Sequence, residues 1–173
     1  MSEFDQFTDF QPGGEDVPST YPEAISVFYA DSGTVLLTFL VAVISAIKAI
    51  AFGINFVDFL CLGSIYFLWC IVGWGIHRYI WHAEPIPIVK KGIKTLGYDM
   101  HVDHHKNPWD YSTILFSWSN IFIGALILFG VLLLIIPSTG FAMTILVSAL
   151  IMILLHEWYH FIVHTKINPV NAP

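Results

Sequence analysis

Residues 141–163 read FAMTILVSALIMILLHEWYHFIV, an apolar run whose last two turns carry histidines. No charged residue occurs between positions 141 and 155. An α-helix needs about 20 mostly apolar residues to cross the roughly 30 Å hydrocarbon core of a bilayer. The run is therefore predicted to form a membrane-spanning helix.

Three more apolar runs precede this one, at 34–52, 54–76 and 119–136. The charged residues in them are Lys48, near the end of the first run, and Asp58, near the start of the second. The chain is 56% hydrophobic and 12% charged, whereas soluble domains carry about 25% charged residues. We therefore predict an all-α, multi-pass membrane protein with four transmembrane helices.

The connections between the runs differ in length. The first two runs meet at Gly53, and the last two meet at the Pro-Ser-Thr-Gly turn of 137–140. Such short links predict two antiparallel hairpins. The segment 77–118 between the hairpins is long, so it should share one membrane face with both termini.

The basic residues predict which face this is. Lys and Arg in short loops favour the cytosolic side. Both termini and all the histidines are therefore expected to be cytosolic, in the endoplasmic reticulum if the chain is eukaryotic and in the plasma membrane if it is bacterial. The basic residues on that face are Arg78, Lys90, Lys91, Lys94, Lys106 and Lys166, whereas Lys48 lies on the other.

Residues 1–33 differ in composition from the rest. They hold seven of the 13 acidic residues and no Lys or Arg, and they include Pro18 and Pro22. This composition predicts a flexible acidic tail, followed by a transmembrane domain over 34–173. The tail has no basic start or early apolar segment, so it is not a secretory signal. The net charge of −6 argues against nucleic acid as a partner.

All eight histidines fall in three clusters at the edges of the apolar runs. The cluster at 156–164 has i, i+4, i+8 spacing, which places its imidazoles along one helix face. Adjacent imidazoles in HVDHH at 101–105 point in different directions and could serve two metals. The eight are His77, His82, His101, His104, His105, His156, His160 and His164.

Clustered neutral imidazoles with few carboxylates suit iron or zinc and do not suit magnesium or calcium. Three separate clusters at one membrane face therefore predict a cytosolic, histidine-rich metal site. Asp103 and Glu157 are candidates to orient a ligand imidazole through a hydrogen bond. Each also has a plainer reading, as a solvated charge for Asp103 and as the partner of a basic residue for Glu157. Cys61 and Cys70 match no zinc or redox spacing and read as small helix residues.

These motifs resemble those of a known family. HRYIWH at 77–82 followed by HVDHH at 101–105 is similar to the H-x4-H and H-x2-HH motifs of the fatty acid hydroxylase and sterol desaturase superfamily of integral membrane di-iron enzymes. HHKNPWD at 104–110 resembles the HH-x2-P-x-D signature of its hydroxylases. HEWYHFIVHT at 156–165 resembles their Y-E/D-x2-H-x3-H segment. The resemblance covers about 34–168.

The resemblance implies an O2-dependent lipid monooxygenase that holds two iron ions, with zinc an alternative in purified protein. The substrate would be an acyl, sterol or carotenoid lipid in the bilayer, and the electron donor a small redox protein such as a cytochrome b5 or a ferredoxin. His156 stands where the family usually has a tyrosine, so we expect it to support the ligands rather than bind. The implied ligands are His77, His82, His101, His104, His105, His160 and His164.

One departure from the family pattern affects the expected activity. The family has a further H-x2-HH segment roughly fifteen residues after the position of His164, and this sequence ends at Pro173. We expect a truncated reading of a longer chain, or alternatively an inactive remnant of a hydroxylase. Two other classes compete: a membrane cytochrome that carries electrons on haem, and a divalent-metal transporter. A cytochrome would place single histidines inside helices, and a transporter would place polar residues at mid-membrane.

Overall fold

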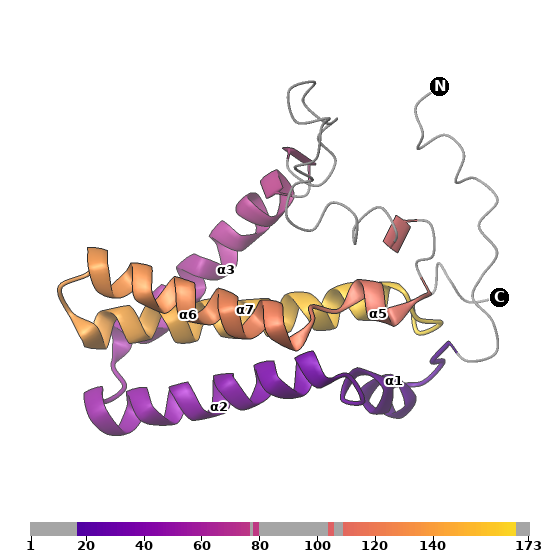
Figure 1. Cartoon of the computed structure of the whole chain (residues 1–173), viewed down its shortest axis with the longest axis horizontal. Helices are drawn as coiled ribbons and strands as arrows, with labels where there is room; N and C mark the ends of the chain where they lie inside the picture. The colour runs from indigo at the N-terminus through magenta and orange to yellow at the C-terminus, as the bar shows by residue number, and fades with distance from the viewer. Residues whose placement is uncertain (1–16, 77, 80–103, 106–108, 169–173) are drawn as a thin grey trace.

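The computed structural model describes residues 17–76, 78–79, 104–105 and 109–168, and within these ranges the chain is helical and has no strand. Figure 1 shows three long helices lying alongside one another and a fourth leaving them at an angle. The prediction of an all-helical chain with four long apolar helices is confirmed. The helices are α1 (Tyr21–Phe28), α2 (Ser32–Phe52), α3 (Phe56–Ile76), α5 (Tyr111–Ile114), α6 (Trp118–Ile135) and α7 (Thr139–Val163).

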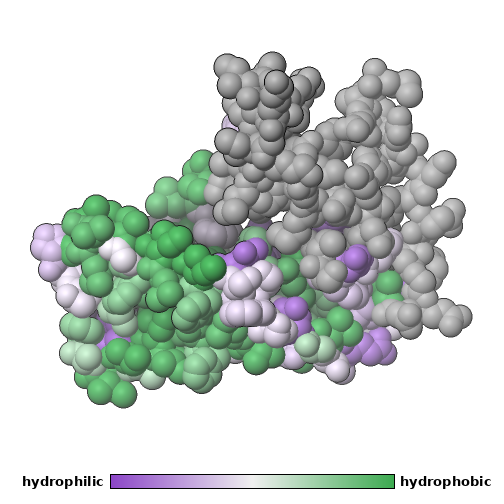
Figure 2. Space-filling view, in the orientation of Figure 1, coloured by the Kyte–Doolittle hydropathy of each residue, from purple (hydrophilic) through white to green (hydrophobic). Residues whose placement is uncertain are grey.

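Four of these helices, α2, α3, α6 and α7, are long and apolar enough to cross a membrane. Much of the surface in Figure 2 that these helices form is hydrophobic. Large apolar side chains stand almost fully exposed there, such as Ile50 at 88% and Leu134 at 87%. A soluble protein rarely exposes so much contiguous apolar surface, so the surface suits a lipid environment.

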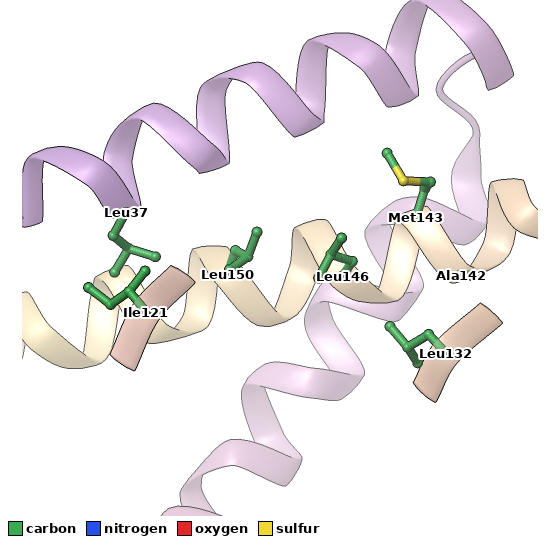
Figure 3. Close-up of a cluster of buried hydrophobic side chains, with 7 residues drawn as sticks. All are labelled: Leu37, Ile121, Leu132, Ala142, Met143, Leu146 and Leu150. Carbon is green, nitrogen blue, oxygen red and sulfur yellow. The ribbon is translucent and has the colours of Figure 1, made fainter. Parts of the chain in front are cut away.

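Helix α7 is the centre of the bundle. It contacts α2, α3 and α6, and α2 also contacts α6. Leu146 and Leu150 of α7 are buried, and Figure 3 shows Leu37 of α2 pointing toward Leu150 and Ile121. In its most apolar stretch, 39% of α7 is buried, whereas none of the corresponding stretch of α3 is. Among the four long helices, α7 is therefore the one whose side chains are most enclosed by the others.

Side-chain caps set where the spanning helices begin. Asp31 accepts a hydrogen bond from the Thr34 N–H at 2.9 Å, and Ser138 accepts one from the Phe141 N–H at 3.3 Å. Such caps satisfy backbone donors that a helix start leaves unpaired. They explain why α2 and α7 each begin two residues before the apolar runs at 34 and 141.

Two glycines shape the ends of α2. Gly53 closes the helix with a φ of +72°, a backbone conformation that other residues rarely adopt. Gly33 lies in the first turn, where an added Cβ would stand 2.1 Å from the carbonyl oxygen of Phe116. The backbone of α2 therefore approaches the chain just before α6 more closely than any side chain would allow.

Part of the predicted flexible tail is folded. Residues 17–33 include α1, which begins with a capping box between Thr20 and Glu23. Phe28 is 1% exposed and packs against Phe161 of α7, with ring centroids 5.5 Å apart. The acidic, proline-containing composition hid these local signals, which fix a helix even in a polar segment. Residues 1–16 lie outside the described part of the chain.

Helix α3 joins α2 through a buried polar contact. The Lys48 ammonium pairs with the Asp58 carboxylate and donates to the Gly53 carbonyl at 2.7 Å. Asp58 also accepts from the Thr144 hydroxyl of α7 at 2.5 Å. The two charges that interrupt the apolar runs thus neutralise each other where α2, α3 and α7 meet.

Candidate metal centre

Three histidines from two distant segments converge. His104 lies in a short helical piece at 104–105, His160 in the last turn of α7, and His164 at its C-cap. The ring centroid of His104 lies 5.0 Å from that of His160 and 4.6 Å from that of His164, and those of His160 and His164 are 5.2 Å apart. One ligand atom from each ring lies within 4.8 Å of the others.

Local structure explains how α7 contributes two of the three. Residues four apart on an α-helix share a face, so His160 and His164 present their rings side by side. The intervening Phe161 points the other way, is fully buried, and packs against Phe28. The helix register therefore fixes both imidazoles relative to the core.

The segment that carries His104 is tied to α7 at two later points. The Tyr111 ring of α5 packs on Phe161 with centroids 4.9 Å apart, and burial raises the pKa of Tyr111 to about 12. Two residues after α5 ends, Phe116 donates its backbone N–H to the Glu157 carboxylate at 2.8 Å. These contacts hold 109–116 along the end of α7, next to the histidines.

One of the three histidines is buried and the other two are partly exposed. His104 is only 5% exposed. Burial lowers the pKa of the His164 imidazole to about 4, and the nearby charge of His105 acts in the same direction. A neutral imidazole keeps a nitrogen lone pair available, and metals bind this form of histidine.

Three imidazoles fit one borderline divalent ion. Zinc–nitrogen bonds of about 2.0–2.1 Å in tetrahedral geometry place ligand nitrogens about 3.3 Å apart. The ligand atoms of the three rings lie within 4.8 Å of one another, which is somewhat wider than that separation. The trio contains no carboxylate, as expected for iron, zinc or copper and not for calcium or magnesium.

Two other predicted residues lie beside the trio. The ring centroid of His105 is 5.7 Å from that of His104. That of His156 is 5.9 Å from His160 and 5.8 Å from Trp69 of α3. Neither belongs to the group of three whose ligand atoms converge. His156 sits one turn before His160 on α7, and its expected role in supporting the ligands stays a prediction.

Glu157 has a structural role that the sequence does not predict, as the acceptor of a backbone hydrogen bond. It is 1% exposed and accepts the Phe116 N–H, so it anchors the chain that leads from His104 to α6. The sequence suggested a basic partner or a ligand imidazole instead. The available signal was an acidic residue inside an apolar helix, where burial demands a specific partner. The remaining predicted site residues, His77, His82, His101 and Asp103, lie outside the described residues.

Comparison with known proteins adds no relative: no protein-family model matches the chain, and no curated protein or solved structure does. Among the described residues, the histidine trio at the end of α7 is a candidate metal site. Its geometry can hold a metal ion at the end of a helix that could span a membrane.

Proposed function

We propose that the chain is the membrane-embedded part of a histidine-ligated lipid hydroxylase that uses O2 and two iron ions. One observation carries the proposal: His104 meets His160 and His164 at the end of a helix apolar enough to cross a bilayer. Buried histidines at such a place are costly and so favour a functional role. The kind of enzyme is suggested by the resemblance of 77–82, 101–110 and 156–165 to motifs of the fatty acid hydroxylase and sterol desaturase superfamily.

The proposed reaction inserts oxygen into an unactivated C–H bond of a bilayer lipid. One atom of O2 becomes the new hydroxyl group and the other leaves as water, with two electrons from a small redox protein and two protons. Bound iron supplies the chemistry that activates O2. His104, His160 and His164 would hold one ion, and the second would take its ligands from His77, His82, His101 and His105.

The chain's own contribution is to position the site and exclude water. Phe28, Phe161 and Tyr111 pack behind the histidines, so the imidazoles are backed by apolar side chains. The exposed apolar flanks of the long helices would guide a lipid tail from the bilayer to this end of the bundle. The basic segment 90–106 could dock an acidic electron carrier, contact anionic lipid, or fix the topology.

The proposed topology puts the site at the cytosolic face. In it the chain crosses the membrane four times as two hairpins, α2 with α3 and α6 with α7. Both termini and the histidines face the cytosol because most basic residues flank that side. A C-terminal reporter that is active only outside the cytosol should stay silent.

Lipid mass spectrometry tests the proposed activity. Cells expressing the full reading frame should contain a lipid that has gained one oxygen, or has lost two hydrogens if the enzyme desaturates. A His104→Ala variant should lack this product, whereas Tyr159→Ala should retain it, since Tyr159 is 63% exposed beside His160. No new product at full expression would refute the enzyme. A Soret band in the purified protein would favour the haem carrier instead.

A further inference from the structure

Helix α1 has two apolar faces, and the core uses only one of them. Ala24 and Phe28 are buried against α5 and α7. Tyr21, Ile25 and Tyr29 are 60%, 48% and 45% exposed. Their i, i+4, i+8 spacing lines them up along one side of the helix and its C-cap.

The order of residues around α1 is that of a helix lying at a boundary. At about 100° per residue, the exposed stripe adjoins the buried one, and the polar side beyond it carries Glu23 and Ser26. Glu23 is committed to the capping box, where it accepts from the Ser19 and Thr20 backbone N–H groups. Helix α1 therefore has three adjoining faces: one that contacts the protein, one that is apolar and exposed, and one that is polar and exposed.

The position of α1 in the chain identifies what can cover that stripe. Three residues, 29–31, separate it from α2, and Asp31 caps the start of this spanning helix. The Thr34 hydroxyl in the first turn of α2 donates to the Phe28 carbonyl, which ties the two helices together. Helix α1 is thus held beside the end of a helix that could span a membrane, where a bilayer surface would lie.

We propose that α1 is an interfacial helix whose Tyr21, Ile25 and Tyr29 stripe inserts into the headgroup–acyl boundary of the bilayer. Aromatic residues favour that depth, where the ring is partly buried and the hydroxyl stays hydrated. Helix α1 carries no basic residue, so its insertion relies on apolar contact rather than on anionic lipid. Near the start of α2, Val35 and Phe39 are likewise exposed, at 48% and 61%.

The insertion would also set the depth of the candidate metal centre. Phe28 stacks edge-on against Trp158, with ring centroids 5.1 Å apart, and packs on Phe161 beside His160. Just before α1, the Pro18 carbonyl accepts a hydrogen bond from the Lys166 N–H at 2.9 Å. The membrane contact of α1 would therefore hold the end of α7 at the water boundary, independently of whether the site holds iron.

Spin-label accessibility in vesicles tests the proposal. In the full chain carrying Cys61→Ala and Cys70→Ala, a label is placed at Ile25→Cys on the stripe or at Ser26→Cys on the polar side. After reconstitution in phosphatidylcholine, the ratio of collisions with O2 to collisions with a water-soluble nickel chelate should be severalfold higher at position 25 than at 26. Adding phosphatidylglycerol should leave both ratios unchanged.

Each other outcome overturns the proposal. Equal ratios at the two positions would place the stripe in water. Low access of both reagents to position 25 would mean that protein covers it, either another part of the chain or a second copy. A high ratio that appears only with phosphatidylglycerol would point to charge-driven binding. Metal analysis of the same labelled proteins keeps this test separate from the proposed enzyme function.

Discussion

The Glu157 carboxylate accepts a hydrogen bond from the backbone N–H of Phe116 at 2.8 Å, joining residues 41 positions apart. Glu157 is 1% exposed and lies between His156 and His160 on α7. Phe116 directly precedes Ser117, whose side chain caps α6. This bond therefore fixes both the start of α6 and the segment that comes from His104.

Removing the acceptor should loosen the site without touching a candidate ligand. Glu157→Ala leaves a buried N–H unsatisfied, which costs about 1–3 kcal/mol, whereas Glu157→Gln keeps a carbonyl oxygen in reach. We expect the alanine variant to unfold at clearly lower temperature in detergent and to bind metal more weakly, with the glutamine variant close to the wild type. Equal melting temperatures for all three proteins would show that the bond contributes nothing.

The close approach of Gly33 to Phe116 predicts a sharp difference between two glycines. Gly33→Ala would force its Cβ against the Phe116 carbonyl, 2.1 Å away, so we expect a loss of about 1–3 kcal/mol of stability, typical of overpacking. Gly63 of α3 has no neighbour within 4 Å of an added Cβ. Gly63→Ala should therefore be neutral or slightly stabilising. Detergent denaturation curves compare the two, and similar losses would contradict the packing described.

The Lys48–Asp58 pair predicts non-additive substitutions. The Lys48 and Asp58 side chains are 7% and 16% exposed. Lys48→Met leaves the partly buried carboxylate without its cation, and an unpaired polar group of this kind costs about 1–3 kcal/mol. The double variant Lys48→Met with Asp58→Asn should recover most of this loss. A single variant as stable as the wild type, or a double variant worse than both singles, would show that the pair is not coupled.

Much of the fold could be predicted from the sequence because apolar length alone identifies a spanning helix. The four runs match α2, α3, α6 and α7 to within two residues at every end. The earlier starts of α2 and α7 come from the N-caps Asp31 and Ser138, polar residues that an apolar pattern does not include. Helix α1 is not predicted, because the polar composition around Thr20 and Glu23 is typical of a flexible tail. The two residues form a capping box, which starts a helix there.

The candidate site was predictable in part. Helical spacing alone puts His160 and His164 on one face. Their meeting with His104 depends on contacts between distant segments, namely Tyr111 on Phe161 and Phe116 on Glu157. No local pattern encodes such contacts, so the sequence could propose eight histidines without selecting these three.

His160 and His156 lie near the end of α7 in different surroundings, so replacing them should reduce activity by different amounts. His160 belongs to the converging trio, whereas the ring of His156 faces Trp69 with centroids 5.8 Å apart. We expect His160→Ala to abolish lipid product formation and His156→Ala to retain part of it, as measured by mass spectrometry of the same cells. Equal and complete loss in both would make His156 a ligand.

Metal binding should stabilise the folded chain. A ligand that binds only the folded state at 100 times its Kd adds about 2.7 kcal/mol. Removing metal with a chelator should therefore lower the unfolding temperature, and adding iron(II) or zinc should restore it. The Tyr159→Ala variant should respond in the same way, whereas His164→Ala should respond less, because it loses the ion that the three converging histidines share. A chelator shift of full size in His164→Ala would place the metal elsewhere.

The most direct measurement is the metal content of the purified chain. It is determined by elemental mass spectrometry after expression in medium supplied with iron and zinc. We predict that the wild type and Tyr159→Ala retain stoichiometric metal. His104→Ala, His160→Ala and His164→Ala should each lose the same ion, because the three imidazoles share it. A wild type without bound metal, or a single alanine variant that keeps the full complement, would contradict the metal centre.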